Sequence, residues 1–359
     1  MKDECMASTQ NSLHYFPPLS KTKYTILKIR RLELTGDNVV STSESKTRNP
    51  YVELLRPEIA DMDLALPAAS ALLAAYLATG GFPPLIPFII AVIGGYAAIT
   101  SSYVYNDCCD MDIDKINLPN RPLVSNRLTR DQALKYALFL FVVAGAAALI
   151  LNPESFVVLL IAVGTISIYS AIAKRATFLS FVPVGIAYGL VPIGIWLAFD
   201  STGILNIPGL FGVVPSYGDI LPLPAIFLGL MMCFTDWGFT LSGVARDVEG
   251  DRARGAPTFP VTFGIEATSK FVTFMWVVGV IASIAIGLTA ELGPVYFAGA
   301  LLAGGWMLTQ SFDFIKNPLP ERGGKLFLQG SRYRGIMFGS LILDVILLVL
   351  VPAYSGILW

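Results

Sequence analysis

The chain has 359 residues, of which 54% are hydrophobic and only 14% are charged. Soluble domains carry roughly 25% charged residues, so the composition excludes an ordinary soluble protein and indicates a polytopic α-helical membrane protein. The formal net charge of −1 provides no basic surplus for binding nucleic acid.

The chain divides into two regions of different composition. Residues 1–50 are polar and mixed, and we expect a mobile cytoplasmic N-terminal extension. This extension contains the only histidine, His14, which argues against histidine-based catalysis. Residues 51–359 form the predicted membrane domain, because they contain nine apolar segments of roughly the 20 residues that a bilayer requires. The segments are 60–79, 84–106, 132–151, 155–173, 178–198, 220–243, 270–290, 294–314 and 335–355.

Lysine and arginine lie at alternate connections between these segments, or within the first few residues of the segment that follows. They lie before the first segment and in the connections after the second, fourth, sixth and eighth, and the other four connections contain none. Basic connections remain in the cytoplasm. The pattern therefore predicts a cell-membrane protein whose N-terminus and basic loops are cytoplasmic.

The second segment ends in the acidic motif NDCCDMDID, at residues 106–114. On a continuous helix, Asn106, Asp107, Asp110 and Asp114 share one face. Asp112 and the two cysteines point elsewhere. Taken alone, such a cluster is equally well a hydrated helix end.

A second acidic stretch, RDVEGDRARG, follows the sixth segment on the same predicted side. Asp247 and Asp251 are four residues apart and share one helical face. Two carboxylate clusters on one side suit Mg²⁺, which keeps water and substrate phosphates among its ligands. Basic residues flank both motifs and suit a polyanionic substrate. They are Lys115, Arg121, Arg246, Arg252 and Arg254, with Lys174 and Arg175 in a third basic loop.

The two motifs and their surroundings resemble the UbiA-type intramembrane prenyltransferases. NDCCDMDID matches the family pattern NDxxDxxxD, and DVEGD matches DxxxD. The flanking stretches IDKINLPNRPL and GDRARGAPTFPVTFG also match, as does LLRPE at 54–58. The resemblance extends from residue 51 to the C-terminus. It implies an all-α fold of nine transmembrane helices around a central cavity.

The resemblance also implies an active site. Asp107, Asp110, Asp114, Asp247 and Asp251 would hold Mg²⁺ and a prenyl diphosphate. Asp107, Asp110, Asp247 and Lys174 would be catalytic through ionisation of the allylic diphosphate. The implied substrate-binding residues are Asn106, Arg121, Tyr169, Lys174, Arg175, Arg246 and Arg252. Tyr169 lies five residues before Lys174, whereas four is the commoner spacing in the family.

The lipophilic acceptor is the least constrained part of the hypothesis. The stretches around both motifs most resemble the archaeal branch, which attaches geranylgeranyl to geranylgeranylglyceryl phosphate. The sequence departs from the family at Ile59, Asn126 and Pro257, and it adds Glu58, Asp61 and Asp63 near the first segment. An aromatic, quinone-type or tetrapyrrole acceptor therefore stays open, as does a UbiA-type terpene cyclase without an external acceptor.

Overall fold

The computed structural model describes residues 48–200 and 221–359. The predicted N-terminal extension, except for its last three residues, and most of the connection after the fifth segment lie outside the described residues. From Asn49 onward the described residues belong to one compact unit. All of its regular structure is helical, with no strand among the described residues, which confirms the predicted all-α class.

Nine long helices lie at the nine predicted segments of the described chain. They are α3 (Ala60–Thr79), α4 (Leu85–Cys109), α6 (Arg130–Leu151), α7 (Pro153–Ile168), α9 (Phe181–Leu197), α10 (Leu223–Arg246), α12 (Phe259–Thr289), α13 (Pro294–Lys316) and α14 (Pro320–Leu350). Short elements lie between and after them: α2 (Pro50–Leu54), α5 (Met111–Asn117), a π-helical turn (Tyr169–Ala173), α8 (Lys174–Ala176), α11 (Val248–Ala253) and a final 3₁₀ helix (Pro352–Ile357).

Seven helical segments of the described chain are long and apolar enough to cross a membrane, and α9 is apolar but shorter. The count of nine crossings stays a prediction. Two helix starts differ from the predicted segments by more than three residues. α12 begins at Phe259 and is interrupted at Gly264, whose φ of 83° is left-handed. α14 begins at Pro320, 15 residues before the predicted start, because a proline at the first helical position favours a helix and the basic residues that follow do not stop one.

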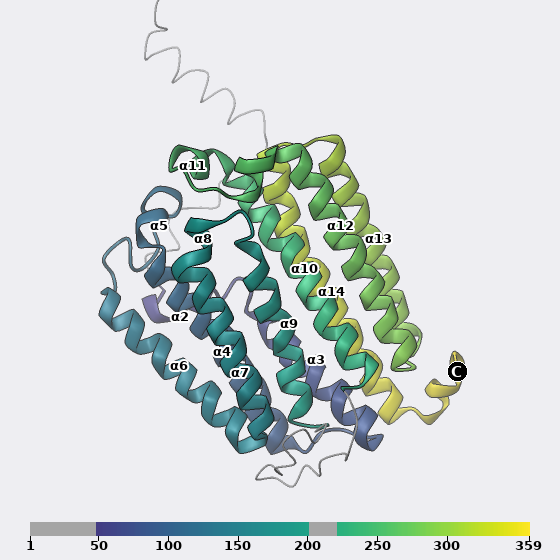
Figure 1. The fold of residues 1–359 in the computed structure, drawn as a ribbon. Helices are drawn as coiled ribbons and strands as arrows, with labels where there is room; N and C mark the ends of the chain where they lie inside the picture. Colours follow the sequence, from purple (N-terminus) through teal and green to yellow (C-terminus); the bar gives the residue numbers. More distant parts are fainter. Residues whose placement is uncertain (1–47, 201–220) are drawn as a thin grey trace, which may run out of the picture. The chain divides into compact units, whose positions relative to one another are not determined.

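The helices form a closed series of packed neighbours (Figure 1). α3 packs against α4 and α14, and α10 packs against α9, α12 and α14. Glycine permits the closest of these approaches. A Cβ atom at Gly185 of α9 would lie 2.7 Å from the Cys233 carbonyl oxygen of α10. Among the long helices, α3, α4, α7, α9, α10 and α14 contribute residues to the cavity that both acidic motifs line.

Candidate functional site

Both acidic motifs interrupt the helix that carries them. α4 ends at Cys109 and α5 begins at Met111, with Asp110 between them at φ −102° and ψ 13°. α10 ends at Arg246 and α11 begins at Val248, with Asp247 between them at φ −93° and ψ 8°. The shared faces inferred from helical spacing assume a continuous helix through each motif, and the structure interrupts that helix at one residue in each case. Aspartate favours such breaks, because its side chain competes with the helical backbone for hydrogen bonds.

The breaks place α5 and α11 at the same end of the helix bundle, which we call the motif end (Figure 1). Between them lies a cavity of about 740 Å³, which we call the polar cavity. Its lining includes five predicted site residues from the two acidic motifs: Asn106, Asp110, Asp114, Asp247 and Asp251. The polar cavity therefore brings both motifs to one space.

Arginine side chains contact the carboxylates of the first motif. One Nη atom of Arg121 lies 2.7 Å from Asp107 and 2.7 Å from Asp114. Arg56, just before α3, lies 2.9 Å from the same oxygen of Asp107. Burial raises the pKa of Asp114 above its ordinary value, although the charge of Arg121 opposes this shift. Arg121 is thus beside the first motif, as predicted.

Asp112 corrects one expectation for the first motif. It lines the polar cavity and forms an ion pair of 2.8 Å with Arg175. Slight burial opposes a low pKa for Asp112, but the hydrogen bond and the charge of Arg175 lower it below the ordinary value. The side chain reaches the cavity because the break at Asp110 changes the direction of the chain. The cysteines do not line the cavity, in agreement with the prediction, and Cys108 packs in an apolar cluster.

The second motif is also contacted by arginines. Arg246 lies 2.8 Å from Asp247, and Arg254 lies 3.2 Å from Asp251. Both arginines line the polar cavity. Arg252, which the sequence suggested as a substrate-binding residue, is exposed and is not part of the lining. Arg254, the next arginine along the chain, lines the cavity.

The remaining predicted residues lie around the first motif. Asn106 donates a hydrogen bond of 2.9 Å to Asp110 and accepts one of 3.2 Å from Ser170. Tyr169 begins the π-helical turn and lines the polar cavity. Lys174 begins α8, but its side chain lies outside the described part of the structure.

The polar cavity also contains charged residues that lie outside the two acidic motifs. Asp236 of α10 and Arg334 of α14 form a buried ion pair of 2.8 Å, and both line the cavity. Tyr103 and Tyr188 line it nearby. Ionisable residues inside apolar helices are uncommon and often functional, and this signal could have identified Asp236 and Arg334.

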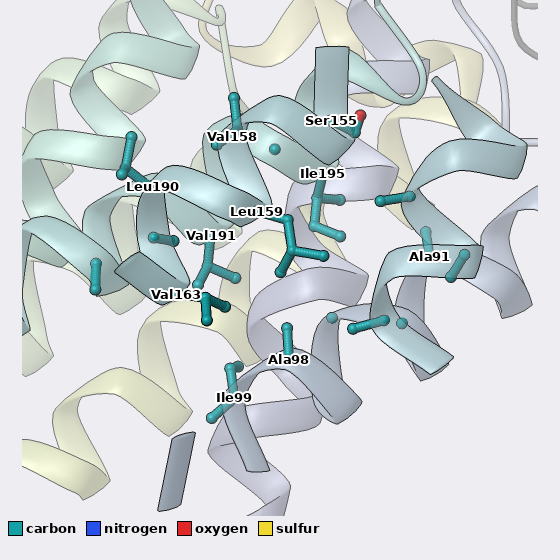
Figure 2. A pocket seen from close by; sticks show the side chains of 18 of the residues that line it. Ala91, Ala98, Ile99, Ser155, Val158, Leu159, Val163, Leu190, Val191 and Ile195 are labelled. Carbon is teal, nitrogen blue, oxygen red and sulfur yellow. The ribbon is translucent and has the colours of Figure 1, made fainter. Parts of the chain in front are cut away.

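An apolar pocket lies among α4, α6, α7 and α9 (Figure 2). Its lining consists mainly of small and aliphatic side chains, including Ala98, Leu159 and Val191. Three residues, Ser102, Ile166 and Tyr188, line both this pocket and the polar cavity. The two spaces therefore share a wall or an opening at these residues.

The acidic motifs offer hard carboxylate oxygens, which suit Mg²⁺. In the described part of the chain, no group of three histidine, cysteine, aspartate or glutamate side chains is arranged to hold a metal ion. The donor chemistry therefore fits Mg²⁺ only where a ligand such as a phosphate completes the coordination.

Comparison with known proteins gives consistent matches. The model of the UbiA prenyltransferase family matches residues 67–342. A digeranylgeranylglyceryl phosphate synthase from Thermococcus sibiricus is 28% identical over 276 residues, covering 77% of this chain and 90% of the relative. A protoheme IX farnesyltransferase from Desulforudis audaxviator is 27% identical over 314 residues, covering 86% and 92%.

Solved structures show the same fold. The apo structure of a UbiA homolog from Aeropyrum pernix K1 has a TM-score of 0.64 at 20% identity, covering 80% of this chain and 98% of that one. A UbiA homolog from Archaeoglobus fulgidus bound to GPP and Mg²⁺ has a TM-score of 0.53 at 19% identity, covering 82% and 99%.

Proposed function

The chain belongs to the UbiA prenyltransferase family, and from this we propose that it transfers a geranylgeranyl-class group from its diphosphate to the hydroxyl of geranylgeranylglyceryl phosphate. Both substrates are lipids with anionic heads. The observation that carries the proposal is the junction of the polar cavity with the apolar pocket. The first would hold the anionic heads, and the second would hold a prenyl chain.

The diphosphate is proposed to bind at the motif end of the polar cavity. Asp107, Asp110 and Asp114 from the first motif and Asp247 and Asp251 from the second would hold Mg²⁺. Bound there, Mg²⁺ supplies positive charge that stabilises the leaving diphosphate. Phosphate oxygens and water would fill the coordination positions of Mg²⁺ that the protein does not fill, as is usual for this ion.

Protein side chains would contribute the remaining charge. Arg121, Arg246 and Arg254 already lie at the motif end and would donate hydrogen bonds to phosphate oxygens. Arg175, which pairs with Asp112 of the first motif, and Lys174 of the same basic loop would do the same. The apolar pocket would exclude water from the allylic carbon, because water there would hydrolyse the developing cation.

The proposed acceptor is supported by the charged residues of the polar cavity and by the names of the relatives. Six arginines of the described chain line the polar cavity: Arg56, Arg121, Arg175, Arg246, Arg254 and Arg334. Six aspartates of the described chain line it as well, so arginines become available only when Mg²⁺ binds carboxylates that now pair with them. A second anionic head would fit the arginines released in this way. The Thermococcus sibiricus relative is named for a glyceryl phosphate product. A tetrapyrrole acceptor is the second candidate, because the Desulforudis audaxviator relative is named as a protoheme IX farnesyltransferase.

Product analysis tests the function. The purified protein in lipid nanodiscs is incubated with Mg²⁺ and geranylgeranyl diphosphate. Separate samples contain geranylgeranylglyceryl phosphate, protoheme, an aromatic quinone precursor or no acceptor. We expect a new ether, seen by mass spectrometry, only with the glyceryl phosphate, and we expect EDTA to abolish it.

Other products would contradict the proposal in different ways. If the product is a prenylated haem or a prenylated quinone precursor and no ether forms, the protein is a prenyltransferase but the proposed acceptor is wrong. A cyclic hydrocarbon in the sample without acceptor would identify a terpene cyclase. We further propose that the motif end faces the cytoplasm of the cell membrane, in agreement with the distribution of lysine and arginine.

A further inference from the structure

The polar cavity and the apolar pocket meet at Tyr188. This residue of α9 lines both spaces, together with Ser102 of α4 and Ile166 of α7. The proposed function places the diphosphate in the polar cavity and the prenyl chain in the apolar pocket. The bond between them, which breaks in the reaction, would then lie near Tyr188.

A chain of hydrogen bonds leads from Tyr188 to a buried carboxylate. The hydroxyl of Tyr188 donates to the hydroxyl oxygen of Tyr103 at 2.8 Å. The hydroxyl of Tyr103 donates to the two carboxylate oxygens of Asp63 at 3.1 and 2.9 Å. Both tyrosines line the polar cavity, whereas Asp63 does not. All donors in the chain point toward Asp63, so the Tyr188 oxygen retains lone pairs that can accept a proton.

The surroundings of Asp63 favour a proton acceptor over a metal ligand. Asp63 is 1% exposed, and Tyr103 is its only hydrogen-bond donor among the described residues. No cation of the described chain forms an ion pair with it. A carboxylate buried at membrane depth is costly, and protonation removes that cost. Asp63 is therefore suited to receive a proton during the reaction.

Two arginines lie over the tyrosine rings. The guanidinium carbon of Arg56 is 4.4 Å from the centre of the Tyr103 ring. That of Arg334 is 6.0 Å from the centre of the Tyr188 ring. A cation over an aromatic ring stabilises negative charge that develops on the phenol oxygen. Arg56 is also paired with Asp107 and Arg334 with Asp236, so each would stabilise a transient phenolate only with the charge that its aspartate leaves uncompensated.

We propose that Tyr188, Tyr103 and Asp63 form a relay that removes the proton from the acceptor hydroxyl, an inference that rests on the proposed function. The acceptor oxygen forms a bond to the allylic carbon, and the bond from that carbon to the diphosphate breaks with its electron pair. The hydroxyl proton passes to Tyr188, the proton of Tyr188 passes to Tyr103, and that of Tyr103 passes to Asp63. After the ether leaves, the proton returns along the same path to water.

In this relay Tyr188 is the residue that touches the acceptor, and Tyr103 and Asp63 act through it. The relay is needed because an ether cannot form unless the hydroxyl loses its proton. It also distinguishes the acceptor class, because a terpene cyclase without an external acceptor has no hydroxyl to deprotonate. General acid–base groups typically contribute about 10²–10⁴-fold to a rate.

Three variants test the relay in single-turnover experiments with geranylgeranyl diphosphate and geranylgeranylglyceryl phosphate. Asp63→Asn retains an oxygen that accepts the hydrogen bond of Tyr103 but cannot accept its proton. Tyr188→Phe removes the first acceptor of the relay, and Asp63→Glu restores a carboxylate. We expect the first two to slow ether formation by about 10²-fold or more, and Asp63→Glu to be faster than Asp63→Asn.

Two further measurements distinguish a proton relay from a purely structural role of these three residues. The affinity for geranylgeranyl thiolodiphosphate, which does not ionise, should stay within twofold of the unaltered protein in each variant. The unaltered protein should show a solvent deuterium isotope effect on ether formation, and Asp63→Asn should lose it. Tyr296→Phe is the matched control, because Tyr296 is also buried and its hydroxyl donates to the Ser283 carbonyl at 2.6 Å, outside both cavities.

The outcomes distinguish the relay from the proposed function. If the unaltered protein forms no ether with the glyceryl phosphate, the proposed function fails and the relay fails with it. If it forms the ether and Asp63→Asn does so at the same rate, the relay alone is overturned. A slower Asp63→Asn that keeps the isotope effect or loses thiolodiphosphate affinity also overturns the relay, because it identifies a structural role.

Discussion

Arginine residues occupy positions beside the carboxylates of both acidic motifs. Arg121 contacts Asp107 and Asp114, and Arg254 contacts Asp251. These pairs offset repulsion between carboxylates that lie close together. A diphosphate with Mg²⁺ would offer the carboxylates a cation and the arginines an anion. The same side chains can therefore exchange partners when the substrate binds, without a large change in net charge.

The role of the carboxylates is tested by Asp247→Asn. The change keeps the size of the side chain but removes its charge, so we expect Mg²⁺-dependent kcat/KM to fall by about 10²–10³-fold. Asp131→Asn is the matched control, because Asp131 is exposed and, among the described residues, pairs only with Lys135 on α6. Full Mg²⁺-dependent release of diphosphate by Asp247→Asn would show that the metal assignment is wrong.

Arg252 and Arg254 form a second matched pair. Arg254 lines the polar cavity, and Arg252 is exposed outside it. Arg254→Gln should raise the KM for the prenyl diphosphate roughly tenfold, since a hydrogen bond to a charged group contributes about 1.5–3 kcal/mol. Arg252→Gln should leave it nearly unchanged. Equal effects of the two variants in steady-state kinetics would contradict the assignment of Arg254.

Sequence could identify the acidic residues, but not which arginine faces them. Arg252 and Arg254 are two residues apart in the same basic stretch, so composition does not distinguish them. Their orientations depend on where α11 ends, and Arg254 is the residue that follows the last residue of that helix. Tyr188 gave no local signal, because a single tyrosine in an apolar helix is ordinary.

At the scale of elements, the sequence predicted where the long helices lie but not where they break. Apolar length determines a membrane segment, and each long helix of the described chain overlaps its predicted range. The interruptions at Asp110 and Asp247 occupy one residue each. Helical spacing fits the motifs with or without these breaks. Only the structure shows that the two breaks turn α5 and α11 over the same cavity.

The walls of the apolar pocket lead to a prediction about chain length. Ala162 of α7 lines the pocket, whereas its neighbour Ile161 is 53% exposed and faces away from it. Ala162→Phe should fill the pocket and lower kcat/KM for geranylgeranyl diphosphate roughly tenfold, because overpacking costs about 1–3 kcal/mol. Farnesyl diphosphate, which is one isoprene unit shorter, should be less affected.

Ile161→Phe is the control for this change, because it adds a ring to the outer face of the same helix. Competition between the two diphosphates, with products separated by chromatography, gives the preference directly. If Ala162→Phe alters neither the preference nor the rate, the prenyl chain does not occupy the apolar pocket.

At the scale of the whole molecule, the arrangement of charge and the position of the site agree. Both acidic motifs and the basic connections beside them lie at the motif end of the bundle (Figure 1). Their positive charge would keep this end in the cytoplasm, where a soluble diphosphate product can leave. The apolar pocket lies between helices farther from the motif end. Such an arrangement suits an enzyme that takes lipid chains from the bilayer and releases an ion into water.

The orientation can be measured by cysteine labelling in sealed inside-out and right-side-out vesicles. Asp131→Cys places a thiol beside the motif end at the start of α6, and Thr79→Cys places one at the opposite end of α3. Both original side chains are exposed. A membrane-impermeant maleimide should label Asp131→Cys only in inside-out vesicles and Thr79→Cys only in right-side-out vesicles. The unaltered protein measures labelling of the native cysteines, and detergent-opened vesicles should label both variants. The reverse pattern would place the motif end outside the cell and contradict the orientation that lysine and arginine predict.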